Sequence, residues 1–401
     1  MSLLTPAEAD RLIGAQLRAL PEESLPLSQC AGAVLREEIR AERDQPPFDR
    51  VAMDGFALSA QAVQRGIRRL RVQAFQAAGD APATLADDTQ CIEIMTGAML
   101  ARGCDAVVPV ERVARHGDVI ELAGSPAIEP WQNVHRRASD AREGTRLLAP
   151  GTTLGAPEIA VAASAGHPRL RVAAQPSIIV ISTGNELIEP GEPILPHQVR
   201  RSNAYGLSAQ LRLHGFDRVS DDHLVDDAAT LRHAIGRHLG THDLLILSGG
   251  VSAGRLDLVP QVLGELGVQQ HFHGIAQRPG KPLWFGTVPG GAAVFGLPGN
   301  PVSSLVCLAR YVVPALRAAA GRLFAPPAPV ALAAPVRVTP PLAYYLPVRL
   351  AHDAQGRVAA QPRPTNGSGD FTSLVGSDGF VELPPGPNQY QQGFIAPFHR
   401  W

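Results

Sequence analysis

Three short apolar runs, each followed by a glycine-containing loop, constrain the fold of this chain more than any other feature. The runs cover residues 177–182, 243–247 and 293–297, and the loops after them contain Thr-Gly-Asn-Glu, Ser-Gly-Gly-Val-Ser and Pro-Gly-Asn-Pro. Strands that are apolar along most of their length are typical of parallel sheets covered by helices on both faces. The repeated order of strand, glycine loop and helix therefore predicts a doubly wound α/β domain.

The remaining chain predicts further domains, because 401 residues exceed what one ordinary core accommodates. Thr5-Pro6-Ala7-Glu8 predicts a capping box that starts a helix ending before Pro21. Short alternating segments with Gly and Pro over residues 51–115 predict a mostly β insertion, and the tail from residue 324 predicts a small β domain. We expect a helix in 1–26 that packs on the α/β domain, a linking domain from 27–45 and 146–174, a mostly β domain in 46–145, the α/β domain in 175–322 and a C-terminal β domain in 323–401.

The loops after the apolar runs predict a site for an anion. In an open parallel sheet, ligands bind outside the carboxyl ends of the strands, where these loops meet. Small loop residues let backbone N–H groups close on a phosphate, and a helix N-terminus favours an anion. The residues expected to bind the ligand are Ser248, Gly249, Gly250 and Ser252 in one loop, and Asn300, Pro301 and Ser303 at the start of a helix.

Lys281 is the single lysine among 36 lysine and arginine residues. A lysine is a compact point charge that enters a narrow oxyanion pocket, whereas the guanidinium of arginine is a wide planar fork. The alternative is chance, since a rare lysine has to fall somewhere. Its neighbours Gly280, Pro279 and Pro282 indicate a fixed loop of close approach, which favours contact between Lys281 and an anion.

Acidic residues near the same loops suggest a cation. Glu186 and Asp257 follow the first and second glycine loops, and carboxylates beside a phosphate usually need Mg²⁺ between them. Helix capping is the alternative for each: Glu186 as an acid of a first turn, and Asp257 as an N-cap. For one residue of the pair Asp226 and Asp227, which precedes a helix, capping is also the simpler explanation.

Composition excludes several classes of partner. The net charge of −1 leaves no broad basic surface for nucleic acid or an anionic membrane, and we expect no apolar stretch of membrane-spanning length. The four scattered cysteines fit neither a zinc site nor a disulfide framework, and no secretion signal is evident. We therefore expect a cytoplasmic protein.

Six segments, taken in order, resemble a known family. They are residues 47–57, 95–98, 182–187, 248–252, 278–282 and 296–303. In order and spacing they are similar to the molybdopterin molybdenumtransferases, the MoeA family that includes the gephyrin E domain. The resemblance covers roughly residues 1–322.

The resemblance implies an activity and an assembly. The family inserts molybdate into adenylylated molybdopterin (adenylyl-molybdopterin) and releases AMP, with Mg²⁺ as cofactor. It implies a MogA-like α/β domain and an elongated homodimer, in which the mostly β domain of one subunit contributes to the active site of its partner. A MogA-type adenylyltransferase is a further expected partner.

The resemblance also implies roles for individual residues. Lys281 and Arg278 would hold phosphate or molybdate, and Glu186 and Asp257 would hold the metal. The remaining matched positions are Pro298 and Pro301, which would shape the pocket, and Asp54, Thr96, Asp140 and one of Asp226 and Asp227, which would belong to the catalytic set. Of the last two, we take Asp227 as the catalytic candidate. Four departures from the family pattern are Val51, the Ala138-Ser139 pair, Arg278 in place of a lysine, and a missing arginine near Tyr344 and Tyr345. The last of these leaves the tail without an assigned role.

Two alternative functions remain open. One is an adenylyltransferase of the related single-domain type, although the β insertion around Met53, Asp54 and Gly55 is absent from that smaller type. The other is a non-catalytic molybdopterin-binding scaffold, because the gephyrin E domain also clusters receptors. The presence of the acidic residues together with Lys281 favours an enzyme.

Overall fold

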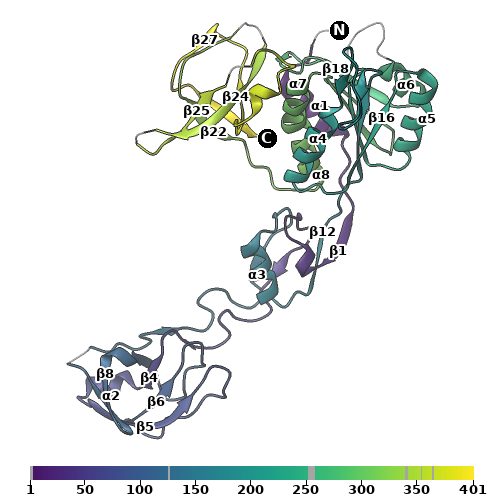
Figure 1. Cartoon of the computed structure of the whole chain (residues 1–401). Coiled ribbons are helices and arrows are strands. Elements are labelled where there is room, and N and C mark those ends of the chain that lie inside the picture. Colours follow the sequence, from purple (N-terminus) through teal and green to yellow (C-terminus); the bar gives the residue numbers. More distant parts are fainter. Residues whose placement is uncertain (1–2, 125–126, 252–257, 339–341, 354, 364) are drawn as a thin grey trace. The chain divides into compact units, whose positions relative to one another are not determined.

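The computed structural model describes all residues except 1–2, 125–126, 252–257, 339–341, 354 and 364. The chain forms two compact units. Unit 1 comprises residues 1–36, 150–154 and 170–401, and unit 2 comprises residues 37–149 and 155–169. Unit 1 contains the α/β domain and the C-terminal β domain (Figure 1).

The α/β domain is built on one six-stranded sheet of order β16-β13-β17-β21-β20-β18. The first four strands are parallel, whereas β20 and β18 are antiparallel to their neighbours. The predicted apolar runs form its three central parallel strands. The strand bounds are β13 Ile178–Thr183, β16 Val219–Leu224, β17 Leu244–Ser248, β18 Gln269–His273, β20 Trp284–Thr287 and β21 Ala293–Leu297. The predicted doubly wound α/β fold is confirmed.

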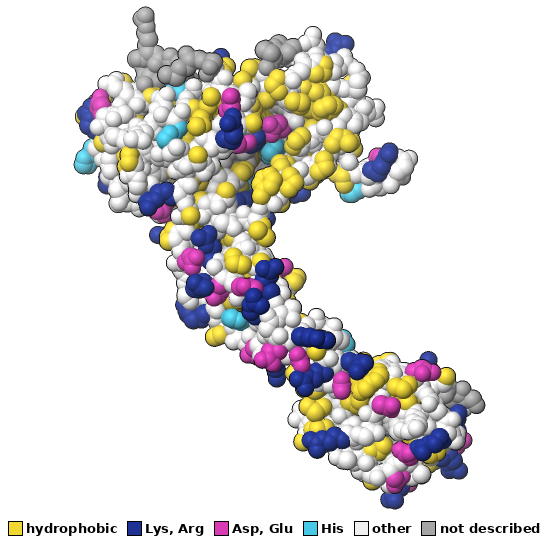
Figure 2. Space-filling view, turned by 180° about the vertical axis from the view of Figure 1, so that it is seen from behind, with side chains coloured by type: hydrophobic (Ala, Val, Ile, Leu, Met, Phe, Trp, Pro, Cys, Tyr) yellow, Lys and Arg dark blue, Asp and Glu magenta, His cyan; other side chains and the backbone are white. Residues whose placement is uncertain are grey.

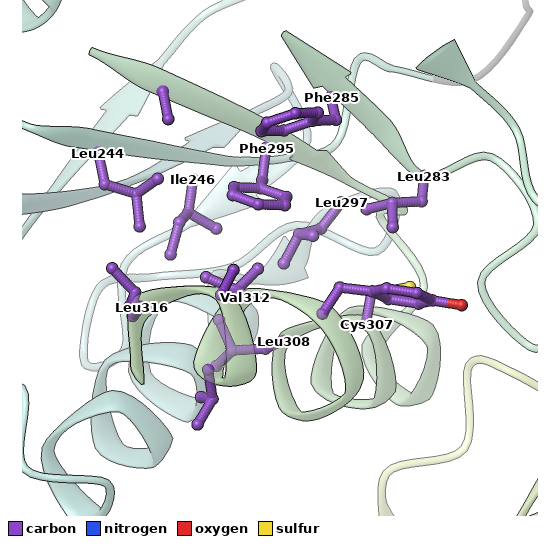
Figure 3. Close-up of a cluster of buried hydrophobic side chains, with 14 of the residues drawn as sticks. Leu244, Ile246, Leu283, Phe285, Phe295, Leu297, Cys307, Leu308, Val312 and Leu316 are labelled. Carbon is purple, nitrogen blue, oxygen red and sulfur yellow. The ribbon is translucent and has the colours of Figure 1, made fainter. Parts of the chain in front are cut away.

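Successive side chains of a strand point to opposite faces of the sheet. Because the three central parallel strands are apolar along most of their length, both faces of the sheet are apolar there and helices cover both. Ile178 and Val180 of β13 belong to one buried cluster, and Ile179 and Ile181 belong to the other. Figure 3 shows the first cluster, in which strand residues such as Ile246 lie over the long C-terminal helical segment of the domain. Each such fully buried side chain contributes roughly 1.5–3 kcal/mol to folding.

The helices of unit 1 are regular except for one segment. Their bounds are α1 Pro6–Gln16, α4 Ser202–Leu213, α5 Ala228–Leu239, α6 Val259–Glu265, α7 Pro301–Cys307 and α8 Val313–Ala319, with a π-helical turn η3, Leu308–Val312, between the last two. The predicted capping box of α1 is confirmed, because Glu8 N–H donates to Thr5 Oγ1 and Thr5 N–H donates to Glu8 Oε2. Pro301–Ala319 is long and apolar enough to span a membrane, contrary to the sequence expectation, but 72% of this apolar stretch is buried in the fold.

The C-terminal domain is a closed β structure. Its sheet has the order β19-β24-β25-β22-β28-β26, and β24 also pairs with β26, which closes the barrel. The bounds are β19 Gln277–Arg278, β22 Ala328–Leu332, β23 Val336–Arg337, β24 Ala343–His352, β25 Val358–Pro362, η4 Thr372–Leu374, β26 Gly379–Leu383, β27 Gln389–Tyr390 and β28 Ile395–Arg400. The strand β19 comes from the α/β part of the chain, so the two domains share one sheet.

Short elements complete unit 1. They are β1 Glu22–Pro26, which pairs with β12 Arg169–Ala173, the turn η1 Leu27–Gln29, and the paired strands β14 Leu187–Ile188 and β15 Val199–Arg200. On the face shown in Figure 2, arginine side chains are interspersed with carboxylates rather than gathered into one basic stripe.

Unit 2 is mostly β, as the alternating segments predict. Its main sheet has the order β7-β4-β6-β5-β9-β8. The bounds are β4 Gly55–Leu58, α2 Ala60–Gln64, β5 Arg69–Gln76, β6 Gln90–Ile94, β7 Ala106–Pro109, η2 Val110–Arg112, β8 Val113–His116 and β9 Val119–Leu122. The other elements are β2 Ile39–Arg40 with β11 Arg146–Leu148, β3 Arg50–Val51 with β10 Val134–His135, and α3 Ala156–Ser164.

Candidate active site

The loops after β13, β17 and β21 meet at the carboxyl edge of the sheet. Gly249 N–H donates to Leu297 O at 3.4 Å, which joins the second and third loops. Asn203, near the start of α4, ties them further, since its Nδ2 donates to Ser248 Oγ and to Gly299 O, both at 2.8 Å. Sequence reasoning placed Ser248 here but missed Asn203, whose position two residues after Arg201 carries no motif of its own.

This edge leaves polar atoms without partners among the described residues. The buried oxygens Ser182 Oγ, Thr183 Oγ1 and Asn203 Oδ1 have no hydrogen-bond partner. Buried polar groups are normally paired with protein, water or ligand, so a water or ligand bound at this edge would satisfy these oxygens. Gly249, with φ +99°, has no room for a side chain, because a Cβ atom there would lie 2.8 Å from Thr183 O.

A pocket of about 590 Å³ lies beside this edge, within unit 1. The predicted residues that line it are Arg278, Lys281, Pro298, Asn300 and Ser303. The described lining contains these two cations and no carboxylate. Both cationic side chains belong to exposed residues. The pocket is therefore electrostatically suited to an anion.

The C-terminal domain supplies much of the same pocket. Its lining residues are Leu342, Tyr344, Tyr345, Pro347, Thr365, Gly367 and Ser368. Ser368 also caps α7, since Val302 N–H donates to Ser368 O at 3.0 Å and Asn300 Nδ2 donates to Ser368 Oγ at 2.9 Å. Asn300 is the N-cap residue by position, but its side chain makes no capping bond to the helix. The sequence left the role of the tail unassigned and did not predict these contacts.

Gly280, the residue before Lys281, packs closely against neighbouring side chains. Gly280 has φ +92°, and a Cβ atom there would lie 2.5 Å from Cys307 Sγ and 2.6 Å from Gln277 Nε2. Only glycine fits this close approach without displacing its neighbours. The carbonyl of Lys281 accepts from Ile275 N–H at 2.8 Å. Burial raises the pKa of the Cys307 thiol to about 12, so this cysteine stays a neutral packing group.

The acidic residues of unit 1 that were predicted for the site lie in different surroundings. Glu186 is exposed just after β13, with its carboxylate against Gly184. Asp227 is the N-cap of α5, where its Oδ2 accepts from Thr230 N–H at 2.8 Å, so the capping alternative describes its contact. Asp257 and Ser252 lie outside the described residues. Among the residues that are described, no group of three or more His, Cys, Asp or Glu side chains is arranged to hold a metal.

Two predicted acids of unit 2 are held in hydrogen bonds at its surface. Asp54 Oδ1 accepts from Thr96 Oγ1 at 2.6 Å and from Thr96 N–H at 2.7 Å. These bonds, that from the side chain first, lower the pKa of Asp54 below its ordinary value. Asp140 Oδ1 lies 3.0 Å from His135 Nε2 and accepts from Ser139 Oγ. The catalytic roles of these residues stay predictions.

Comparisons with known proteins identify the family. A molybdopterin molybdenumtransferase of Synechocystis sp. is 39% identical over 400 residues, which is 100% of both chains. The chain belongs to this family. Three family models match it in succession: "MoeA N-terminal region (domain I and II)" at residues 4–166, "Probable molybdopterin binding domain" at 179–318, and "MoeA C-terminal region (domain IV)" at 329–401. The resemblance of the six motifs is thereby confirmed, and it extends through the tail.

Other relatives agree with this membership. The molybdopterin molybdenumtransferase of Synechococcus elongatus is 34% identical over 405 residues, covering 98% of this chain and 97% of its own. A crystal structure of a molybdopterin biosynthesis MoeA protein from Pyrococcus horikoshii has a TM-score of 0.80 at 30% identity, and covers 100% of this chain and 99% of its own. The multidomain architecture predicted from the motifs is shared with this crystal structure.

Proposed function

We propose that this protein is a molybdopterin molybdenumtransferase, which inserts molybdate into adenylyl-molybdopterin and releases AMP. One observation carries the proposal: the single lysine of the chain and Arg278 line one pocket that contains no described carboxylate. Molybdate is a dianion, and a pocket with two cations and hydroxyl donors is suited to it. Membership of a family whose relatives carry this name supports the assignment.

Two neighbouring subsites divide the substrates in this proposal. Molybdate binds in the pocket, where Lys281 and Arg278 neutralise its charge. Ser303 and Ser368 also line this pocket. Adenylyl-molybdopterin binds along the carboxyl edge of the sheet, where Ser248, Gly249 and Asn203 lie. Holding both substrates at one edge replaces a bimolecular encounter by a positioned one, which is the main contribution such a site makes to rate.

In this proposal Mg²⁺ would be held mainly by oxygens of water and of the substrate phosphate, because Glu186 is the one predicted metal-binding acid within the described residues and no group of three or more His, Cys, Asp or Glu side chains able to hold a metal ion is present there. Magnesium usually takes one or two protein carboxylates and completes its shell with water and phosphate oxygens. Glu186 supplies one exposed carboxylate at the strand edge, and Asp257 is the predicted second. Bound there, Mg²⁺ would offset the repulsion between these carboxylates and the phosphate of the substrate. Replacing Glu186 by alanine should shift the Mg²⁺ dependence to higher concentration, and an unchanged titration would remove Glu186 from the site.

A homodimer that shares its active site is part of the proposal. In it, Asp54 and Thr96 of one subunit act at the Lys281 pocket of the other. Mixing inactive Lys281→Ala and Asp54→Ala proteins under subunit exchange should restore activity, because one hybrid site is then intact. Absence of any recovery, with exchange verified by mass spectrometry, would contradict the shared site. A cytoplasmic location, and supply of the substrate by a MogA-type adenylyltransferase, complete the proposal.

AMP release tests the function itself. Purified protein with adenylyl-molybdopterin and Mg²⁺ should release AMP only when molybdate is added, as followed by chromatography. Release without molybdate, or formation of adenylyl-molybdopterin from ATP, would favour the adenylyltransferase alternative. Tight substrate binding with no release under either condition would favour the scaffold.

A further inference from the structure

A chain of three buried polar side chains runs from the C-terminal domain to the loop that carries Lys281. Tyr345 on β24 and Tyr311 in the π-helical turn have their hydroxyl oxygens 3.0 Å apart. Tyr311 OH donates to Gln277 Oε1, and Gln277 Nε2 donates to Pro279 O at 3.1 Å. All three side chains are at most 1% exposed.

The hydrogen bonds between these side chains all donate in one direction. A phenol has a single O–H donor, and that of Tyr311 is committed to Gln277. Tyr345 must therefore donate to Tyr311, so the polarity runs from the C-terminal domain towards the loop. Burial raises the pKa of both tyrosines, which keeps both protonated.

At the loop end of these hydrogen-bonded side chains, Gln277 packs against the backbone of Gly280. Gln277 Nε2 would lie 2.6 Å from a Cβ atom at Gly280, so the carboxamide fills the space under the residue before Lys281. A second tie is the parallel pairing of β19 with β24, in which Gln277 aligns with Ala343 and Arg278 with Tyr344. Residues 278–281 are thus joined to β24 by one side-chain path and one backbone path.

We propose that Tyr345 is a positioning residue for molybdate: through Tyr311 and Gln277, the C-terminal domain fixes the loop that presents Arg278 and Lys281. This inference deepens the proposed function and rests on it for its kinetic consequences. It also assigns the tail a role in the affinity for the oxyanion. The ring of Tyr345 packs edge-on against the ring of Phe380, with 5.5 Å between the ring centroids. The hydroxyl of Tyr345 can therefore be removed while this packing is kept.

The kinetic test compares Tyr345→Phe and Tyr311→Phe with Tyr390→Phe in AMP release. Tyr345 also lines the pocket, whereas Tyr311 does not, so a similar rise in the KM for molybdate in both variants separates the hydrogen-bonded chain from a direct contact. Tyr390 is the matched control, because it is a buried tyrosine of the same domain whose hydroxyl donates to Pro384 O, and it does not line the molybdate pocket. Loss of one buried hydrogen bond predicts a rise of roughly three- to tenfold in the KM for molybdate, with kcat changed by less than about twofold. Tyr390→Phe should leave both constants unchanged. Equal effects of Tyr345→Phe and Tyr390→Phe, a rise in KM for Tyr345→Phe but not for Tyr311→Phe, or a lower kcat at unchanged KM, would overturn the inference.

An activity-independent test uses amide hydrogen exchange on the full chain. The reporters are the amides of Ile275 and Leu283, which donate to Lys281 O and Gly280 O. Tyr345→Phe and Tyr311→Phe should speed exchange at both, and the double variant should add little, since the three groups act in series. Exchange equal to that of Tyr390→Phe would refute the inference. If the wild type releases no AMP, the proposed function fails while this measurement still decides the role of Tyr345.

Discussion

Replacing Lys281 by alanine should abolish most molybdate-dependent turnover and leave the fold intact. The side chain of this exposed residue makes no hydrogen bond or ion pair within the described part of the chain, so the stability change should stay within about 0.5 kcal/mol. Its removal takes away one of the two cations that line the pocket.

The magnitude follows from the charge and the openness of the pocket. Two unit charges 4 Å apart interact by about 4 kcal/mol at an effective dielectric of 20 and by about 1 kcal/mol in bulk water. For a pocket that is partly open to solvent, we expect about 2–3 kcal/mol. Since each 1.4 kcal/mol is tenfold, kcat/KM for molybdate should fall by roughly 30- to 150-fold.

The assay is initial-rate AMP release over a range of molybdate concentrations, with thermal melting as the check on folding. Arg337→Ala is the matched control, because it removes an exposed positive charge of the same unit that does not line the pocket. Lys281→Arg keeps the charge but not the shape, and should recover only a minor part of the activity. A Lys281→Ala protein within about threefold of the wild type would refute the assignment of this lysine.

Three further predictions concern stability. Gly280→Ala should lower the free energy of unfolding by roughly 2 kcal/mol, because φ is +92° and the new Cβ would lie 2.5 Å from Cys307 Sγ; denaturant titration within 0.5 kcal/mol of the wild type would contradict it. Burial raises the pKa of Glu382, but bonds from His399 and Arg310 outweigh this effect and lower the pKa below 4.5. The ionised Glu382 therefore stabilises the fold at neutral pH, and Glu382→Gln should lower the free energy of unfolding there. This difference between the variant and the wild type should shrink as the pH falls below 4.5. Burial lowers the pKa of His214 from 6.5 to about 4, so wild-type stability should fall between these pH values on acidification, and His214→Gln should flatten this slope in melting curves.

The α/β domain could be predicted from sequence because its signals are local. The apolar strand at residues 243–247 and the capping box at Thr5 are each encoded within a few neighbouring residues, and both appear as expected. The unique Lys281 likewise marked the pocket by its chemistry alone. Asp227 shows the limit of such reasoning, since the same residue satisfies a motif match and a helix cap, and only the structure shows the cap.

The contribution of the tail could not be predicted because its contacts are long-range. Ser368 meets Asn300 across 68 residues, and Tyr345 meets Tyr311 across 34. No periodicity or spacing encodes such pairings, which depend on the closure of the C-terminal barrel. The missing arginine near Tyr344 therefore left the tail without an assigned role in the sequence analysis, whereas residues of the tail line the pocket.

The most direct test of the account is to locate molybdate in crystals of the protein by the anomalous scattering of molybdenum. We expect one strong peak in the pocket lined by Arg278, Lys281 and Ser368, within contact distance of Lys281. A peak at the loop that begins with Ser248, or no peak at molybdate concentrations that support turnover, would contradict it.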